Sequence, residues 1–293
     1  MTSVAAVSKK INSIQSKRNS ITIYHTNDLH GNFAPVAGNL GGLNQVKTLL
    51  KKQDISGLLF DAGDFLNGAH NVTQQKETVY AMNKMGYLAA TVGNHELSHG
   101  QDALAALIPS MQFNLVNCNY QFDNALNSLI KPYIIIRSGN YKIGITGVGH
   151  QLKGVKYNDA IACANNTATL LKEKEKCDLV IVLSHLGYSQ KGDLPDNQKL
   201  AQSSENIDLI ISGHNRKLLP GAVICLNKFK KEVIVSQAAW DGLMMGRVVF
   251  GFRNGNEKSD FRAKNLIAGQ AYGQTDAAGF AELRSIQKQL VSA

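Results

Sequence analysis

The 293-residue chain contains few cysteines and no long apolar run. Scattered cysteines without a CxxC pair argue against a zinc knuckle or a disulfide framework. The four are Cys118, Cys163, Cys177 and Cys225. No apolar run approaches the roughly 18–20 residues that a membrane helix needs, so we expect no membrane span. Basic clusters interleaved with aromatic residues are also lacking, so we expect no nucleic-acid partner.

The composition that remains is that of a globular protein, with 44% hydrophobic and 18% charged residues. The length allows one large domain or two modest ones. The formal charge is +9, and the first twenty residues contribute four basic side chains and no acid. We therefore expect residues 1–19 to form a flexible basic tail. A small anionic substrate suits this charge balance but is not required by it.

Short β-rich runs alternate with helical patterns along most of the chain. The predicted strands are 21–25, 58–61, 88–92, 113–116, 134–136, 142–148, 179–183, 209–211, 223–226, 233–236 and 248–252. Helical patterns lie near 42–53, 73–85, 101–108 and 159–176. This alternation predicts an α/β domain with parallel or mixed sheets, and the number of strands favours two facing sheets.

The pattern weakens after about residue 254. The stretch "NGNEKSD" is typical of a turn or loop. A final helix is expected near 277–290, with Phe280, Leu283, Ile286 and Leu290 on one face. We therefore expect residues 254–293 to form a C-terminal loop and helix.

Five of the apolar runs end in a cluster of polar residues. The clusters are "HTNDLHG" with Asp28 and His30, "DAGDFLNG" with Asp61 and Asp64, "GNHE" with Asn94, His95 and Glu96, "SHLG" with His185, and "SGHN" with His214. The carboxyl ends of strands are where ligand groups gather in α/β sheets. Imidazole nitrogens with carboxylate and amide oxygens suit Zn, Mn or Fe. Each cluster alone could be a turn or a core residue, but together they predict a metal centre.

The ordered series "DLH", "GD", "GNHE", "SHLG" and "GHN" resembles the motifs of calcineurin-like metallophosphoesterases. "YHTNDLHG" and "TVGNHE" further resemble the 5′-nucleotidase branch of that family. The resemblance covers residues 20–253, which we expect to form the metallophosphoesterase domain. It implies a four-layer α/β sandwich of two mixed β-sheets flanked by helices.

The resemblance also implies a site for one or two divalent transition metal ions. Asp28 and His30 would bind the first, Asp64 would bridge, and Asn94, His185 and His214 would bind the second. A carboxylate has two oxygens and can bridge such a pair. His95 would lie beside the phosphate as an acid or an electrostatic stabiliser. Asp61 would support its loop, and Glu96 would support the ligands from behind.

The implied activity is hydrolysis of phosphate monoesters, such as nucleoside 5′-monophosphates, by attack of a metal-bound hydroxide. A cyclic-nucleotide or other phosphodiesterase is the alternative within the same family. A third possibility is a weakly active metal-binding subunit that partners a separate nucleotide-binding domain. Members of the branch are commonly exported, so we expect a periplasmic or exported protein, although "MTSVAAVSKK" is too short and polar for an intact signal peptide.

Three features depart from the family pattern. The first departure is Arg216. At this position the family has the second histidine of G-H-x-H, or a glutamine in some nucleotidases, which supplies the last ligand of the first metal. A guanidinium has no lone pair to offer to a metal ion. Arg216 is therefore either a lost ligand or a phosphate clamp. Ser98 stands where an aspartate usually pairs with the catalytic histidine. The usual base-stacking C-terminal domain has no counterpart here, so a separate C-terminal nucleotidase domain protein is a conceivable partner.

Overall fold

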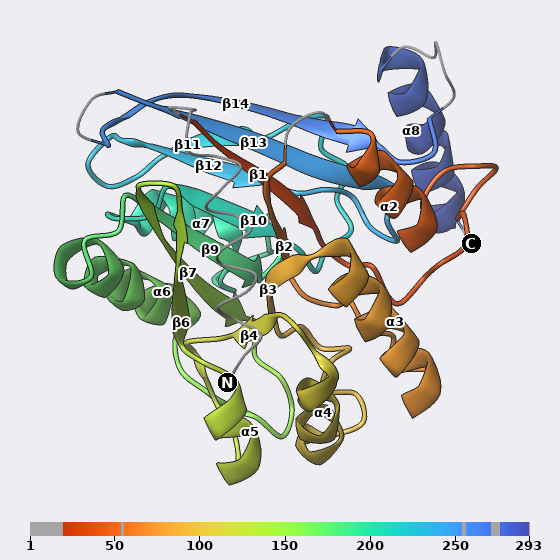
Figure 1. Ribbon diagram of the computed structural model, residues 1–293, viewed down its shortest axis with the longest axis horizontal. Coiled ribbons are helices and arrows are strands. Elements are labelled where there is room, and N and C mark those ends of the chain that lie inside the picture. Colours follow the sequence, from red (N-terminus) through yellow and green to blue (C-terminus); the bar gives the residue numbers. More distant parts are fainter. Residues whose placement is uncertain (1–19, 54–55, 254–255, 271–275, 293) are drawn as a thin grey trace.

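The computed structural model describes residues 20–53, 56–253, 256–270 and 276–292 (Figure 1). Two six-stranded mixed sheets lie face to face, with helices on their outer faces. This arrangement confirms the expected four-layer α/β sandwich. The basic tail expected at residues 1–19 lies outside the described residues.

The first sheet has the strand order β14-β13-β1-β2-β3-β4. Strands β1 to β4 run parallel, while β13 pairs antiparallel with β1, and β14 antiparallel with β13. The bounds are β1 (Ser20–Thr26), β2 (Leu58–Asp61), β3 (Tyr87–Thr91), β4 (Asn114–Val116), β13 (Met244–Phe252) and β14 (Lys258–Ile267).

The second sheet has the order β11-β12-β10-β9-β7-β6, with four parallel central strands and two antiparallel edge strands. The bounds are β6 (Tyr133–Ser138), β7 (Tyr141–Gly149), β9 (Leu179–His185), β10 (Leu209–Ser212), β11 (Val223–Leu226) and β12 (Glu232–Ser236). A small separate ribbon pairs β5 (Tyr120–Gln121) with β8 (Lys156–Tyr157).

The helices divide between the two outer faces. The first sheet is covered by α2 (Leu43–Lys51), α3 (Val72–Met85), α4 (Gln101–Leu107) and α5 (Asn124–Leu129). The second is covered by α6 (Ala160–Thr169), which continues as a π-helical segment (Leu170–Lys174), and by α7 (Asn197–Ser203). Helix α8 (Asp276–Ser292) follows β14. Within the described residues, no helix is both long and apolar enough to cross a membrane.

The central strands are buried on both faces, which explains their nearly continuous apolar sequences. In β9, Ile181 packs between the two sheets, while Val180 and Val182 face α6 and α7. In β1, Ile21 and Ile23 likewise lie between the sheets. Because side chains alternate along a strand, a slip of one residue would exchange these two sets, so the core fixes the register.

Helix α3 shows how local sequence sets the bounds of an element. Asn71 caps its first turn by accepting a hydrogen bond from the Gln74 N–H at 3.1 Å, and the Gln74 side chain accepts one from the Asn71 N–H at 3.1 Å. This reciprocal pair satisfies two donors that the helix itself leaves open. Gly86 ends the helix in the left-handed region at φ 82°.

Strand β14 corrects the expectation of a loop between residue 254 and the final helix. The strand pairs with β13 along nearly its whole length. Its exposed face carries charged side chains at alternate positions, Lys258, Asp260, Arg262 and Lys264. Charges on an edge strand discourage pairing with other chains. They also make the alternating apolar pattern, from which a strand is predicted, difficult to recognise in the sequence.

Helix α8 was correctly predicted. Its Leu283 and Ile286 are buried with Trp240 and Ile267, and Phe280 packs against them. The side chain of Leu290, the fourth residue of the predicted face, lies outside the described residues. The end of the chain is thereby tied to the loop that precedes β13.

A fully buried histidine, His25, lies near the end of β1 opposite Gly246 of β13. Its Nε2 is hydrogen-bonded to Ser236 Oγ at 2.8 Å, so it links the two sheets. A side chain at Gly246 would overlap the imidazole, so only glycine fits there. Burial lowers the pKa of His25 from 6.5 to about 3, because the cation would lose its hydration.

We therefore predict an acid-sensitive contribution of His25 to stability. The native state binds fewer protons at His25 than the unfolded chain between pH 6.5 and about 3. The free energy of unfolding should fall as pH drops through this window, by up to about 1.4 kcal/mol per pH unit. Urea unfolding of the metal-free protein at several pH values measures this slope. His25→Gln should flatten it, and an identical slope in the variant would contradict the prediction.

Candidate metal and phosphate site

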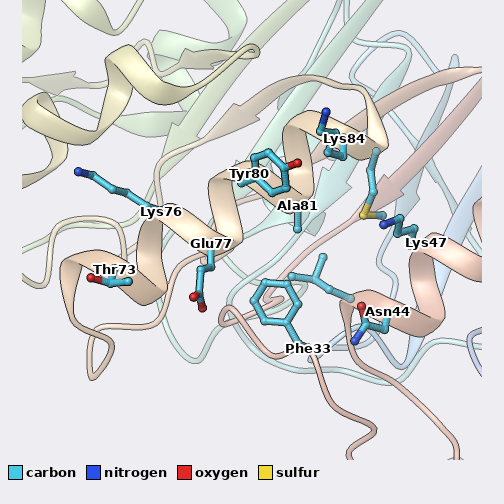
Figure 2. A pocket seen from close by; sticks show the side chains of 11 residues that line it. Phe33, Asn44, Lys47, Thr73, Lys76, Glu77, Tyr80, Ala81 and Lys84 are labelled. Atoms are coloured by element: carbon cyan, nitrogen blue, oxygen red, sulfur yellow. The ribbon is translucent and has the colours of Figure 1, made fainter.

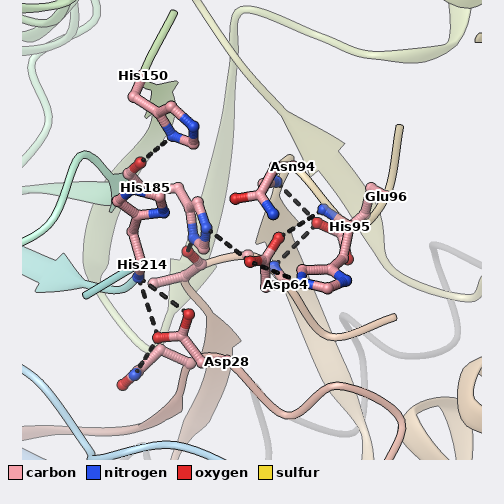
Figure 3. A network of polar contacts seen from close by, with 12 residues as sticks. Asp28, Asp64, Asn94, His95, Glu96, His150, His185 and His214 are labelled. Atoms are coloured by element: carbon pink, nitrogen blue, oxygen red, sulfur yellow. Dashed lines mark hydrogen bonds and ion pairs between the residues drawn. The ribbon is translucent and has the colours of Figure 1, made fainter. Parts of the chain in front are cut away.

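The five predicted polar clusters converge at one edge of the sandwich. Strands β1, β2 and β3 of the first sheet and β9 and β10 of the second deliver them. Figure 3 shows Asp64 at the centre, with Asn94, His95 and Glu96 on one side and His185, His214 and Asp28 on the other. The site therefore lies at the junction of the two sheets, as expected for groups at the carboxyl ends of strands.

The loops after β1 and β2 brace each other through their backbones. The N–H groups of Asp28, His30 and Gly31 donate to the carbonyls of residues 63, 64 and 65 at 2.8–2.9 Å. Four predicted ligands have left-handed backbones, namely Asp28, His30, Asp64 and His214, with φ from 49° to 89°. Such strain persists only where the surroundings enforce it, and it is concentrated at functional sites.

Asp64 is the residue that the two halves of the site share. Its Oδ2 lies 3.1 Å from His185 Nε2 and 3.9 Å from His95 Nε2, and its Oδ1 accepts the His95 N–H at 2.8 Å. Burial would raise the pKa of Asp64, but His185 and the backbone N–H hold it below its usual range. Asp64 is therefore a buried anion.

Potential metal-binding atoms form two clusters around this anion. His30, Asp64 and His95 form one, and Asp64, His185 and His214 form the other, with the atoms of each cluster within 4.8 Å of one another. Burial, together with the neighbouring His185 and His150, lowers the pKa of His214 to about 3, so its imidazole is neutral and can offer a lone pair. Because Asp64 belongs to both clusters, it lies where a bridging carboxylate would.

Two buried atoms near Asp64 make no well-formed hydrogen bond among the described residues, although one of them lies within ion-pair distance of Asp64. They are Asn94 Oδ1 and His185 Nε2. His185 Nδ1 lies 2.8 Å from the Ala62 carbonyl and donates to it, which directs Nε2 toward Asp64. Burial would lower the pKa of His185, but Asp64 raises it to about 10, so the site attracts positive charge at this point. A set of nitrogen and oxygen atoms that includes the unsatisfied Asn94 Oδ1 fits a divalent transition metal ion, which would take the place of the proton on His185.

His95 is arranged as a hydrogen-bond donor rather than as a ligand. The Gly68 N–H donates to His95 Nδ1 at 3.0 Å, so in the neutral ring the proton is on Nε2, the atom that faces Asp64. Burial lowers the pKa of His95; the Asp64 carboxylate opposes this shift, and Arg216 adds to it. His95 is therefore a neutral imidazole that presents an N–H to the site.

Ser98 does not replace the aspartate that usually pairs with this histidine. Its hydroxyl donates to the Asn94 carbonyl at 3.2 Å and makes no described bond to the imidazole. The Nδ1 partner of His95 is thus a backbone donor, where a carboxylate would be an acceptor. This polarity favours the neutral ring over the imidazolium.

Asp28 lies beside His214 rather than in either cluster. Both of its oxygens accept the His214 N–H at 3.0 Å, and Asn27 Nδ2 donates to Oδ2 at 2.7 Å. Burial raises the pKa of Asp28. In this geometry Asp28 ties the loop after β1 to the loop after β10, and its role as a ligand stays a prediction.

Asp61 and Glu96 hold the loops that carry the ligands. Asp61 accepts hydrogen bonds from Thr26 Oγ1 at 2.6 Å and from the Gly63 N–H at 2.8 Å. Glu96 accepts from the N–H groups of Asp64, Leu66 and Gly93 at 2.7–2.9 Å. Burial and the charge of Asp64 raise the pKa of Glu96 to about 7.

Arg216 is exposed at the rim of the site with a left-handed backbone at φ 42°. Its charge is close enough to lower the pKa of His95. It makes no hydrogen bond or ion pair with any described residue. The guanidinium is therefore free to meet an anion that approaches the cluster.

The structure adds two residues that the sequence analysis did not select. His150 follows β7, stacks on the His214 ring at 4.0 Å between centroids, and approaches the His185 carbonyl with Nδ1 at 3.1 Å. Its place at a strand end is the same signal as for the other clusters. Asp241 lies 2.7 Å from His30 Nδ1, but its loop carries no such signal.

A groove of about 520 Å³ lies between α2 and α3, apart from the predicted site residues. Figure 2 shows Phe33 and Tyr80 in it, with Lys47, Lys76 and Lys84 around it. No residue of the two clusters lines this groove. The groove is therefore separate from the two clusters.

Comparison with known proteins identifies relatives of this chain. The family model of the calcineurin-like phosphoesterases matches residues 21–215. The chain is 28% identical over 275 residues to the trifunctional nucleotide phosphoesterase protein YfkN of Bacillus subtilis, covering 79% of this chain and 18% of that protein. It is 27% identical over 278 residues to the 5′-nucleotidase of Vibrio cholerae, covering 82% of this chain and 50% of that protein. The chain thus spans about half the length, or less, of these relatives.

Solved structures share the fold. The 5′-nucleotidase precursor from Thermus thermophilus aligns over 93% of this chain and 59% of its own, with a TM-score of 0.75 and 22% identity. The calcineurin-like phosphoesterase YfkN from Bacillus subtilis aligns over 92% of this chain and 97% of its own, with a TM-score of 0.69 and 23% identity.

Replacement of Glu96 should destabilise the site loops. In Glu96→Gln, an amide –NH₂ that replaced Oε2 would face two buried N–H donors, so we expect a loss of about 2–4 kcal/mol in the free energy of unfolding. Urea unfolding of the metal-free protein measures this loss. Glu77→Gln, at an exposed position of α3, is the matched control and should change stability by less than about 0.5 kcal/mol. Equal stabilities of the two variants would refute the bracing role of Glu96.

Proposed function

The chain belongs to the calcineurin-like phosphoesterase family, and from this premise we propose that it hydrolyses phosphate monoesters, with nucleoside 5′-monophosphates as substrates. One observation carries the proposal: Asp64 lies between potential metal-binding atoms of His30 on one side and of His185 and His214 on the other. The names of the relatives, a nucleotide phosphoesterase and a 5′-nucleotidase, support the choice of substrate.

Family membership implies divalent metal ions, and we propose one or two ions of Zn, Mn or Fe. Asp28, His30 and Asp64 would hold the first, and Asp64, Asn94, His185 and His214 the second. Bound metal would lower the pKa of water and neutralise phosphate charge. The strained backbones of four of these residues support this assignment, because they fix the metal-binding side chains in place before a metal ion binds. The four are Asp28, His30, Asp64 and His214.

His95 would act on the phosphoryl group as a hydrogen-bond donor. Its Nε2–H faces the site while Gly68 occupies Nδ1. A neutral imidazole is a weak acid, so we assign His95 to stabilising charge on a phosphoryl oxygen rather than to protonating the leaving group. The hydrogen bond from the Gly68 N–H keeps this orientation in the absence of an aspartate at position 98.

Arg216 would supply a further positive charge to the substrate. Its exposed guanidinium has no described partner, and the fork geometry of arginine suits two phosphate oxygens. In this role Arg216 would partly offset the missing ligand of the first metal, because it neutralises the substrate instead of binding the ion.

Recognition of the nucleobase would come from outside the described site. The chain spans about half of the Vibrio cholerae 5′-nucleotidase. A C-terminal nucleotidase domain, which a separate partner protein could provide, would recognise the base. An exported or periplasmic location remains our prediction for this protein.

Activity assays on defined phosphate esters test the proposed function. Protein stripped with chelator and reloaded with Mn²⁺ or Zn²⁺ should hydrolyse nucleoside monophosphates and p-nitrophenyl phosphate faster than cyclic nucleotides or bis(p-nitrophenyl) phosphate. In Asp64→Asn, the rate of hydrolysis should fall by more than about 100-fold. A loss of about 100-fold is the upper limit expected when a residue that only hydrogen-bonds to a metal ligand is replaced. Asp260→Asn, on exposed β14, is the control and should retain activity.

Two results would overturn the proposal. One is a metal-loaded protein that hydrolyses none of these monoesters, and the other is full activity in Asp64→Asn. A preference for diesters would instead identify the phosphodiesterase alternative.

Replacement of Arg216 tests the phosphate clamp. Arg216→Ala should raise KM for p-nitrophenyl phosphate about tenfold, the effect expected for one lost hydrogen bond to a charged group. Lys217→Ala, at the exposed neighbouring position, should leave KM unchanged. In Arg216→His, a gain of bound metal with an unchanged KM would show that the arginine is only a lost ligand.

A further inference from the structure

The side chain of Asp241 closely contacts a predicted ligand of the first metal. Asp241 Oδ1 lies 2.7 Å from His30 Nδ1. The His30 side chain is 7% exposed and that of Asp241 is 20% exposed, so the contact is largely shielded from water. A shielded carboxylate–imidazole pair has a defined geometry, in contrast to ion pairs on the open surface.

The backbone of Asp241 is held from two directions. Its N–H donates to the Asp28 carbonyl at 2.7 Å, and its carbonyl accepts the Gly42 N–H at 2.8 Å. Its φ is 48°, a left-handed conformation that aspartate tolerates better than most residues. The loop before β13 is therefore fixed to the loop that carries Asp28 and His30, and Asp241 reaches His30 from a rigid support.

Asp241 contacts His30 from behind rather than joining the cluster. His30, Asp64 and His95 offer atoms that all lie within 4.8 Å of one another, and Asp241 belongs to no such cluster among the described residues. With Nδ1 engaged by Asp241, Nε2 is the nitrogen of His30 that remains for a ligand bond. Metal-binding histidines commonly donate their second N–H to a carboxylate in this way.

We propose that Asp241 is a positioning residue that holds His30 in the Nδ1–H tautomer, so that the Nε2 lone pair is available to the first metal. This inference rests on the proposed function, because that function assigns His30 to a metal. A carboxylate hydrogen-bonded to Nδ1 also makes the imidazole a stronger metal ligand, which would partly offset the ligand that is missing at position 216.

Histidine NMR of the metal-free protein tests the tautomer directly. Long-range ¹H–¹⁵N spectra of the wild type should show His30 protonated at Nδ1. Asp241→Gly removes the carboxylate but suits the left-handed backbone, and it should give a mixture of tautomers. In Asp241→Asn the side-chain oxygen can still accept from Nδ1, so it should retain most of the wild-type signal. Asp193→Asn, at an exposed loop position, is the control.

Metal titration provides the second readout. The binding step for Mn²⁺ that His30→Ala abolishes should weaken about 10- to 100-fold in Asp241→Gly, and less in Asp241→Asn. The other step should be unchanged in both. An unchanged His30 tautomer together with unchanged Mn²⁺ affinity in a folded Asp241→Gly protein would overturn the inference.

These measurements separate the inference from the proposed function. Neither uses a phosphate ester, so a wild-type protein that binds Mn²⁺ through His30 but hydrolyses nothing would refute only the proposed function. A wild-type protein that hydrolyses monoesters, with Asp241→Gly unaltered in tautomer and affinity, would refute only the role of Asp241.

Discussion

A buried anion at the junction of two sheets is the constraint on which the site depends. Asp64 is almost completely buried, and a carboxylate in such a place is tolerable only if positive charge and N–H groups surround it. His185 supplies charge from the second sheet, and the His95 N–H supplies a hydrogen bond from the first. Glu96, which accepts the Asp64 N–H, fixes the loop in turn. Much of the polar network can be understood as the means of keeping one carboxylate ionised in the interior.

The same constraint explains why the ligand-bearing loops are strained. A residue that follows a strand and must turn back toward the junction cannot keep an extended backbone. Asp28, His30, Asp64 and His214 therefore adopt left-handed conformations, and hydrogen bonds between the loops hold them there. The predicted ligands are thus also residues whose backbones are held in strained conformations, so the folded chain fixes their positions.

Much of the fold was predictable because its central strands are apolar on both faces. Runs such as 179–183 and 209–211 are unambiguous, and the polar residues after them mark the site. Strand β14 was missed because an edge strand places charges such as Lys258 and Arg262 toward solvent. Asp241 was missed for another reason: its contact with His30 joins residues 211 positions apart, and only the packed loops bring them together. The neutral state of His95 likewise depends on a backbone N–H, that of Gly68, which residue types do not reveal.

The position of the site between the sheets has a consequence for how the protein responds to distant change. Asp64 and Asn94 follow strands of the first sheet, while His185 and His214 lie at the ends of strands of the second. The two sheets are separated by a layer that includes Phe60, Ile181 and Phe250, none of which is a predicted ligand. Because packed interiors transmit strain, we expect a side chain of altered volume in this layer to shift the two halves of the site relative to each other. The apolar layer thus sets the relative position of the two halves of the site. Residues in this layer can therefore affect activity without contacting a substrate.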